Sequence, residues 1–422
     1  MKRTVFLCGA ILSAGLFAGN AMAQTELSMW YHGAGNKVER SIIVGIINDF
    51  NASQSDYTVK LEEFPQAAYN DSVTAAALSK KLPDILDMDG PNMPNWAWSG
   101  YLQPLDIPES KLANFLPGAI GKWKGKLYSV GLWDAALAMF ARKSVLEENG
   151  IRIPTLDKPW TKDEFDGILA KLKATGKYDY PLDLGMNDKG EWYPYAFSPF
   201  LESFGGDLVD RSTYLTAEGA LNGDNAIAWG NWWQSLFQNK YAPGTSESPS
   251  DQQTGFLDGK FALQWNGNWN AVKAMDKFGD DMLFLPAPDF GHGPKIGAAS
   301  WQFGVTSESK HPEGAAKFIE FAIQDKYLAQ FSDAIGLIPA TSTAAALTKN
   351  YAPGGPLASF FDLSKAQATL RPVTPGYTFI SPTFIKVAAD IADGADVTDT
   401  LDTAVDSINA DIEKNDGYGF KN

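Results

Sequence analysis

The hydrophobic positions between Leu27 and Gly90 alternate between strand spacing and helix spacing. The runs Leu27–His32 and Thr58–Glu63 fit strands, and a short apolar run before Gly90 fits a third. A first helix is predicted by apolar residues at helical spacing, at Val38, Ile42, Ile43, Ile46, Ile47 and Phe50. With a second helix over Asp71–Leu82, this order predicts an α/β domain whose parallel strands are joined by helical crossovers.

The middle of the chain shows the same two spacings. Trp123–Leu132 predicts a hairpin, and the apolar run Ala135–Ala141 predicts a crossover into a second domain. Thr161 and Glu164 form a capping box, which predicts the start of a helix. Because 422 residues exceed what one hydrophobic core usually organises, we expect two domains.

A later helix carries a stripe of aromatic residues. Asp224 or Asn225 is placed to cap its N-terminus. The aromatic spacing is typical of a helix face that packs in a core, at Trp229, Trp232 and Trp233. Two further strands are predicted over Met282–Ala287 and within Lys295–Val305.

Polar side chains follow the predicted strands of the first domain. His32, Asp87 and Asp89 all lie at carboxyl ends, where ligands of parallel α/β sheets bind. No glycine-rich phosphate loop accompanies these strands, so the sequence does not indicate a nucleotide. The three histidines are scattered, without metal-ligand spacing, and we predict neither a metal nor a cofactor.

The stretch Phe256–Asn270 combines a turn, a short apolar run and a polar aromatic bend. In the bend, Trp265 and Trp269 flank Asn266 and Asn268. Indole faces pack on the C–H surfaces of a sugar ring while amides pair with its hydroxyls, so this stretch suggests a carbohydrate site. Either tryptophan could equally fill a core, since aromatic residues are generally well buried.

The N-terminus predicts export. Lys2 and Arg3 precede an apolar run, and Ala21-Met22-Ala23 fits a signal-peptidase site, so we expect cleavage after Ala23 and a periplasmic location. The only cysteine, Cys8, lies in this segment, which excludes disulfides and catalytic thiols from the rest. The formal charge of -15 argues against binding to nucleic acid or anionic membranes.

Several motifs together resemble the extracellular sugar-binding proteins of ABC importers, the family that includes maltose-binding protein. Pro159–Phe165, PWTKDEF, is similar to that family's P-W-T-x-x-E-F helix start. Gly255–Trp269, GFLDGKFALQWNGNW, resembles its F-x-x-G-K-x-A-x-x-x-x-G-x-W element, and Gly336–Pro339 resembles its G-x-x-P turn. The resemblance extends over nearly the whole chain after residue 23.

The resemblance implies a two-lobed α/β periplasmic binding protein fold of type II, with a ligand cleft between lobes joined by a hinge. We expect an N-terminal lobe over 24–134 with a returning segment near 288–340, and a C-terminal lobe over 135–287 with helices from 341–422 packing across the hinge and lobe. The implied ligand-binding residues are His32, Asp89, Asp134, Trp192, Trp265, Asn268, Trp269, Gly297, Ser300 and Arg371.

The resemblance also implies a function. A monomer would capture a sugar, glycoside or alditol by hinge closure and deliver it to the membrane permease of an ABC transporter, without catalysis. Arg371 and the glycine- and serine-rich turns leave room for an acidic or sulfonated glycoside. Two alternatives remain open: a secreted carbohydrate-active hydrolase or lyase with a pair among Asp87, Asp89, Asp134 and Glu191, and a periplasmic binder of a non-sugar anion or polyamine.

Overall fold

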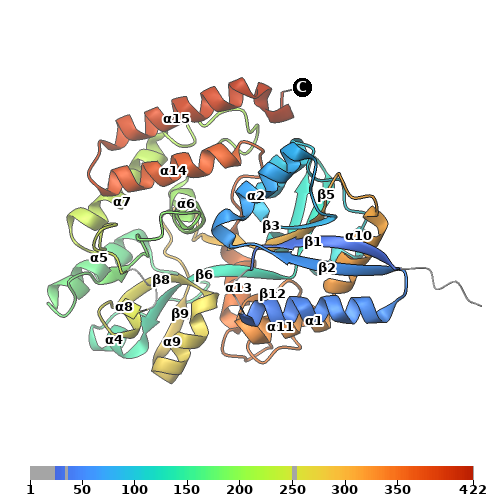
Figure 1. Cartoon of the computed structure of the whole chain (residues 1–422). Coiled ribbons are helices and arrows are strands. Elements are labelled where there is room, and N and C mark those ends of the chain that lie inside the picture. Colours follow the sequence, from blue (N-terminus) through green and yellow to red (C-terminus); the bar gives the residue numbers. More distant parts are fainter. Residues whose placement is uncertain (1–23, 34–36, 250–253, 422) are drawn as a thin grey trace, which may run out of the picture.

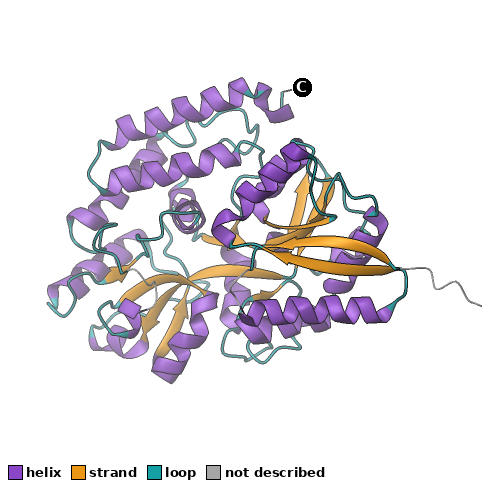
Figure 2. Cartoon of the chain, in the orientation of Figure 1, coloured by secondary structure: helices purple, strands orange, loops and turns teal. Residues whose placement is uncertain are grey.

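The chain forms two α/β lobes that lie side by side (Figure 1). The computed structural model describes residues 24–33, 37–249 and 254–421. Figure 2 shows that each lobe has its own sheet with helices packed around it. The signal peptide predicted over residues 1–23 lies outside the described residues.

The first lobe is built on a sheet of six strands. In spatial order these are β2 (Tyr57–Glu63), β1 (Thr25–Tyr31), β3 (Ile85–Asp89), β11 (Trp301–Val305), β5 (Lys126–Gly131) and β4 (Ile120–Trp123). β1 runs parallel to both β2 and β3, which confirms the predicted strand–helix–strand order. β11 is antiparallel to its neighbours β3 and β5, although it comes from much later in the chain.

Helices cover both faces of the first sheet. On one face the core contains side chains from α1 (Lys37–Ser53), α10 (Pro312–Ala322) and α11 (Asp325–Ile335). On the other face α2 (Gln66–Ser79) and α3 (Met93–Trp98) contribute Tyr69 and Trp96 to a smaller cluster with β3. Five of the six apolar positions predicted for the face of α1 are buried, whereas Val38 at its start is exposed.

The second lobe is organised around β6. Its sheet has the order β13 (Ala368–Thr369), β10 (Ile296–Ala299), β6 (Trp133–Arg142), β8 (Leu263–Gly267) and β7 (Leu182–Asp183). Two short strands also pair with β6, namely β9 (Met282–Leu285) and β12 (Ile338–Pro339). The apolar run predicted to enter the second domain is therefore the central strand of that domain, which explains why every position from Ala135 to Ala141 is buried.

Helices supply most of the second lobe. They are α4 (Lys143–Glu148), α5 (Lys162–Ala174), α6 (Trp192–Phe204), α7 (Asp224–Gln238), α8 (Thr254–Leu257), α9 (Ala271–Phe278), α13 (Ala358–Gln367), α14 (Tyr377–Ala392) and α15 (Val397–Lys414), whereas α12 (Ser342–Ala345) packs against α11 and β12 where the lobes join. The aromatic stripe of α7 is buried, as predicted. The predicted cap of α7 is wrong, because the N-cap is Gly223 and no side chain bonds the helix start. Among the described residues, no helix is long and apolar enough to span a membrane.

The chain passes between the lobes more than once. It leaves the first sheet between Leu132 and Trp133 and returns between Ala299 and Trp301. The segment 288–340 was expected to return to the first lobe. Its first strand, β10, still pairs with β6 and β13 in the second sheet, and the chain re-enters the first sheet only at β11. The chain passes between the lobes again near β12, whose Ile338 pairs with Asp134 at the start of β6. These adjacent passages form the base that connects the two lobes.

The lobes also touch away from this base. The Nδ2 of Asn95, on α3, donates to the carbonyl of Pro375 at 2.9 Å. The ring of Trp98 packs edge-on against Tyr418, with 5.0 Å between centroids. The segment after α15 therefore rests on the first lobe, and Figure 1 shows this end of the chain above β5.

Candidate functional site

A cavity of about 480 Å³ lies between the lobes. Its walls come from both: the carboxyl ends of β1 and β3 and the start of β11 on one side, and the start of α6 and the turn after β8 on the other. The residues that line it are His32, Glu39, Gln66, Asp89, Trp133, Ala135, Asp188, Glu191, Trp192, Tyr195, Trp269, Trp301, Leu337 and Arg371. We call this cavity the cleft.

Aromatic rings make up much of the second-lobe wall. The ring centroid of Trp269 lies 6.1 Å from that of Trp192, and these two rings are nearly perpendicular. It also lies 6.1 Å from the ring centroid of Tyr195. Trp192 is held by a hydrogen bond from its Nε1 to the carbonyl of Leu184 at 3.0 Å. A Cβ at Gly267 would lie 2.0 Å from the Trp269 ring, so the indole can turn back over the end of β8 only because residue 267 is glycine.

His32 and Trp301 face the cleft from the first lobe. Their rings stack at 3.5 Å with an interplanar angle of 14°. Behind the stack, the His32 Nδ1 contacts buried Asp87, and its Nε2 lies 3.8 Å from Glu39. Burial alone would lower the pKa of His32, but attraction to Asp87 and Glu39 outweighs it and raises the pKa above the ordinary value. The imidazole is thus oriented by a carboxylate and favoured as a cation.

Arg371 connects the two lobes within the cleft. Its guanidinium lies at 3.1 and 3.2 Å from the two carboxylate oxygens of Asp89, at the end of β3. It also donates to Glu191, just before α6, at 2.6 Å. Glu191 accepts further hydrogen bonds from the hydroxyls of Tyr377 and Ser381. We call Asp89, Arg371 and Glu191 the charged triad.

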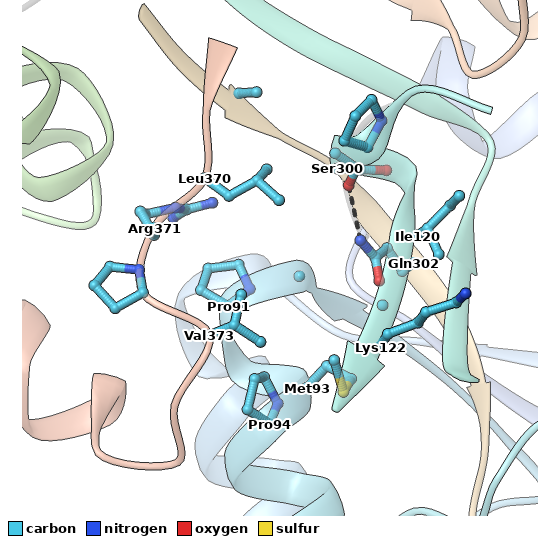
Figure 3. A pocket seen from close by; sticks show the side chains of 16 residues that line it. Pro91, Met93, Pro94, Ile120, Lys122, Ser300, Gln302, Leu370, Arg371 and Val373 are labelled. Atoms are coloured by element: carbon cyan, nitrogen blue, oxygen red, sulfur yellow. Dashed lines mark hydrogen bonds between the residues drawn. The ribbon is translucent and has the colours of Figure 1, made fainter. Parts of the chain in front are cut away.

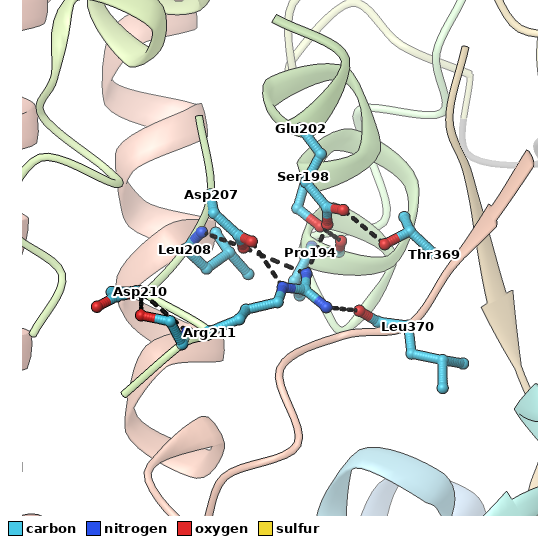
Figure 4. A network of polar contacts seen from close by, with 10 residues as sticks. Pro194, Ser198, Glu202, Asp207, Leu208, Asp210, Arg211, Thr369 and Leu370 are labelled. Carbon is cyan, nitrogen blue, oxygen red and sulfur yellow. Dashed lines mark hydrogen bonds and ion pairs between the residues drawn. The ribbon is translucent and has the colours of Figure 1, made fainter. Parts of the chain in front are cut away.

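A second polar network fixes the segment that carries Arg371 (Figure 4). Arg211 donates to the carbonyl of Leu370 at 2.5 Å and to Glu202 at 2.7 Å. Thr369 donates to the other oxygen of Glu202 at 2.5 Å. Burial raises the pKa of Glu202 to about 7, although Arg211 opposes this shift. Residues 369 and 370 are therefore tied to α6, which sets the position of the next residue.

Four of the predicted site residues lie away from the cleft. Trp265 is in the second-lobe core, where its Nε1 donates to the carbonyl of Ala196 at 2.9 Å. Asn268 is fully buried and bonds Gly336 and Tyr351 near the base. Asp134 is buried and accepts from Ser364 at 2.9 Å. At Gly297 a Cβ would meet the Tyr195 carbonyl oxygen at 2.2 Å, so this glycine lets β10 approach α6.

Ser300 lines a second, small cavity of about 50 Å³ (Figure 3). Arg371 borders both cavities. In the small one, the side-chain amide of Gln302 donates to the carbonyl of Gly118 at 2.8 Å. Ser300 itself is buried and donates to the carbonyl of Trp301 at 2.9 Å. It therefore shapes the passage from β10 to β11.

The structure thus gathers five of the predicted residues at the cleft, at positions His32, Asp89, Trp192, Trp269 and Arg371. Sequence reasoning missed Glu39, Gln66, Trp133, Tyr195 and Trp301, and it named Glu191 only for the hydrolase alternative. Trp301 had a detectable signal, since it lies in the stretch Lys295–Val305 that was predicted to contain a strand. Tyr195 had none, because it lies one helical turn inside the aromatic helix α6. Among the described residues, no group of three or more His, Cys, Asp or Glu is placed to hold a metal.

Two lobes that enclose a polar, aromatic-lined cleft define a class of proteins that bind small solutes. Residues 45–356 match the model of the bacterial extracellular solute-binding proteins. The chain belongs to this family.

Relatives of known name are distant. The multiple sugar-binding protein of Streptococcus mutans is 23% identical over 69% of this chain and 70% of its own. The sn-glycerol-3-phosphate-binding periplasmic protein of Yersinia enterocolitica is 25% identical over 82% of this chain and 81% of its own. Matches to other curated relatives span about two thirds of those proteins, for example 66% of a Streptomyces antibioticus lipoprotein.

Solved structures show the same fold. The cyclic α-maltosyl-1,6-maltose binding protein of Arthrobacter globiformis superposes with a TM-score of 0.76 at 23% identity, covering 93% of this chain and 100% of that one. The sugar-binding protein MalE of Xanthomonas citri gives 0.76 at 21% identity, covering 92% and 98%. These similarities confirm the two-lobed binding-protein fold expected from the sequence.

Proposed function

We propose that this protein captures a carbohydrate in the periplasm and delivers it to the permease of an ABC transporter, without changing it chemically. The observation that carries the proposal is the cleft itself, where Trp192, Trp269 and Trp301 provide aromatic faces beside charged and amide groups. That combination suits a sugar, whose C–H surfaces pack on rings while its hydroxyls form hydrogen bonds. Family membership and the sugars named for several structural neighbours support it.

The mechanism follows from the two-sided cleft. A ligand that contacts both walls binds the closed arrangement more tightly than the open one, so it shifts the population towards closure. Residues at the rim of the closed form would then present a surface that the permease recognises. We further propose that the protein acts as a monomer and is exported with cleavage after Ala23.

The test is isothermal titration calorimetry of the purified protein with neutral sugars, alditols, sugar phosphates and uronates, combined with analysis of the recovered ligand. Saturable binding of one sugar class, with the sugar recovered unchanged, would support the proposal. Appearance of a hydrolysis product would favour the enzyme alternative instead. Absence of binding to all of these probes would overturn the carbohydrate assignment. One named relative is an sn-glycerol-3-phosphate-binding protein, whose ligand is anionic, so the charge of the ligand is a separate question.

A further inference from the structure

The charge of the cleft is dominated by carboxylates. Among the described residues that line it, Arg371 is the only arginine or lysine, whereas four carboxylates face the same space at Glu39, Asp89, Asp188 and Glu191. His32 adds at most one further positive charge, and Asp87 lies behind it. The electrostatic environment is therefore acidic even though it contains the residue type best suited to bind anions.

Arg371 has little capacity left for an anionic ligand. Its side chain is 5% exposed. Both of its terminal nitrogens already donate to carboxylates, to Asp89 at 3.1 and 3.2 Å and to Glu191 at 2.6 Å. A guanidinium recognises an acidic sugar by such paired hydrogen bonds, so the protein's own carboxylates occupy the anion-binding geometry.

Glu191 is held in this role by its other contacts. The hydroxyls of Tyr377 and Ser381, both on α14, donate to its carboxylate. Burial raises the pKa of Glu191, Arg371 lowers it and Asp89 raises it again, so the three groups act as one unit. An anionic ligand would have to displace a carboxylate that three donors from two segments hold in place.

Three of the four acidic groups, Glu39, Asp89 and Glu191, are already engaged by hydrogen bonds within the protein, which disfavours a cationic ligand. Both oxygens of Asp89 bond Arg371, and Glu39 accepts from the hydroxyl of Tyr31. Asp188 is exposed at the rim and accepts from its own loop at Gly190. Hydroxyl groups both donate and accept, so they can add to paired charges without disrupting them.

We propose that the cleft selects an uncharged sugar over an anionic or a cationic one, and that Glu191 determines the discrimination against anions by neutralising Arg371 together with Asp89. The inference rests on the proposed carbohydrate function and adds the charge class of the ligand. It assigns Glu191 a role in specificity beyond shaping the wall.

The experiment is calorimetry with matched probes that differ in one group. The probes are methyl glycosides of glucose, galactose and mannose, the corresponding uronates and 2-amino sugars, together with maltose and trehalose. We expect the wild-type protein to bind its best neutral probe at least about tenfold more tightly than the matching uronate or amino sugar, which corresponds to about 1.4 kcal/mol.

Glu191→Gln tests the residue. The amide keeps the size of the side chain but removes the charge that neutralises Arg371, so the ratio of uronate to neutral affinity should rise about tenfold. Asp188→Asn is the matched control, because it removes the same charge from the cleft without touching Arg371. In this variant the ratio of uronate to neutral affinity should change by less than about threefold, because solvent screens the exposed charge of Asp188. If Glu191→Gln is not folded by circular dichroism, Asp89→Asn serves as the second variant.

Distinct outcomes separate the two proposals. Equal or tighter binding of a uronate or amino sugar by the wild type overturns the selectivity proposal while leaving the carbohydrate function intact. An equal shift in the Asp188→Asn control overturns the role of Glu191. Absence of heat with every probe overturns the proposed function, and the selectivity proposal falls with it.

Discussion

At the scale of single residues, neighbouring tryptophans in one motif have different environments. Trp265 lies inside β8, and its side chain points into the core of the second lobe. Trp269 lies in the 3-10 turn η4 (Asn268–Asn270), where the chain bends and the ring reaches the cleft. A sequence pattern shows that both positions favour aromatic residues, but it does not show where the strand ends.

This difference predicts opposite effects of the same substitution. Trp269→Ala should weaken sugar binding by at least about 1 kcal/mol with a small change in thermal stability, because the ring contributes to the cleft wall. Trp265→Ala should reduce the free energy of unfolding by about 3–5 kcal/mol, because it opens a core cavity. Calorimetry and thermal denaturation of both variants measure the two quantities. Unchanged affinity in Trp269→Ala would remove that ring from the site.

Glu202 predicts a pH dependence of stability. Its folded pKa of about 7 is above the ordinary value of 4.5, so between these values the folded state binds more protons than the unfolded state. The free energy of unfolding contributed by this group should therefore fall as pH rises from about 4.5 to 7, by roughly 1–3 kcal/mol. Denaturant titrations at several pH values would show the wild type losing stability relative to Glu202→Gln over this range. A difference that is flat with pH would contradict the prediction.

Sequence reasoning named residues that line the cleft where position along a strand decides their location. His32 and Asp89 follow β1 and β3, and parallel neighbours bring their ends to one edge of the sheet. Asp134 failed to reach the cleft because the second residue of β6 points to Ser364, inside the base. Strand alternation decides that direction, and a fully apolar run such as the one after Asp134 gives no sign of which face is which.

At the scale of elements, local signals predicted helix starts unevenly. α5 begins with the predicted capping box: the Thr161 side chain accepts from the Glu164 amide at 3.2 Å, and the Glu164 side chain accepts from the Thr161 amide at 3.0 Å. α7 begins after Gly223 without a side-chain cap, although two suitable residues follow. Packing of its aromatic stripe determines where α7 lies, so the cap is dispensable there.

Thr161→Ala should therefore lower the free energy of unfolding by about 1 kcal/mol through loss of the cap. Thr74→Ala is the matched control, since Thr74 is exposed inside α2 and its hydroxyl only bonds the Asn70 carbonyl. That change should be neutral or slightly stabilising, because alanine has the higher helix propensity. Urea denaturation of both variants measures the contrast. Equal losses would show that the capping box contributes nothing specific.

At the scale of the whole molecule, the sequence predicted two lobes and their fold, but not how distant segments combine. The insertion of β11 between β3 and β5 depends on pairing with strands that lie more than 170 residues earlier in the chain, which no local pattern reveals. The same holds for Arg371, which reaches Asp89 and Glu191 from a loop late in the chain. The positions of β11 and Arg371 in the cleft therefore depend on long-range contacts, which local sequence patterns do not predict.

Because the cleft has walls in both lobes, ligand binding should protect both from hydrogen exchange. Mass spectrometry should show slower exchange in peptides over β3 and α3 and over the start of α6 when a saturating sugar is present. Peptides over the outer part of α15 lie away from the cleft and serve as the internal control. Protection confined to one lobe would place the ligand on a single wall and argue against closure.

The position of β11 has a consequence for how the protein is made. The first sheet stays incomplete until residues 301–305 have been synthesised, by which time the second lobe's strands β6 to β10 already exist. Until then β3 and β5 present open edges that other chains could pair with. The long sequence separation also makes this pairing slow. Nascent or truncated chains should therefore depend on chaperones to avoid aggregation, and the first lobe should not fold as an N-terminal fragment.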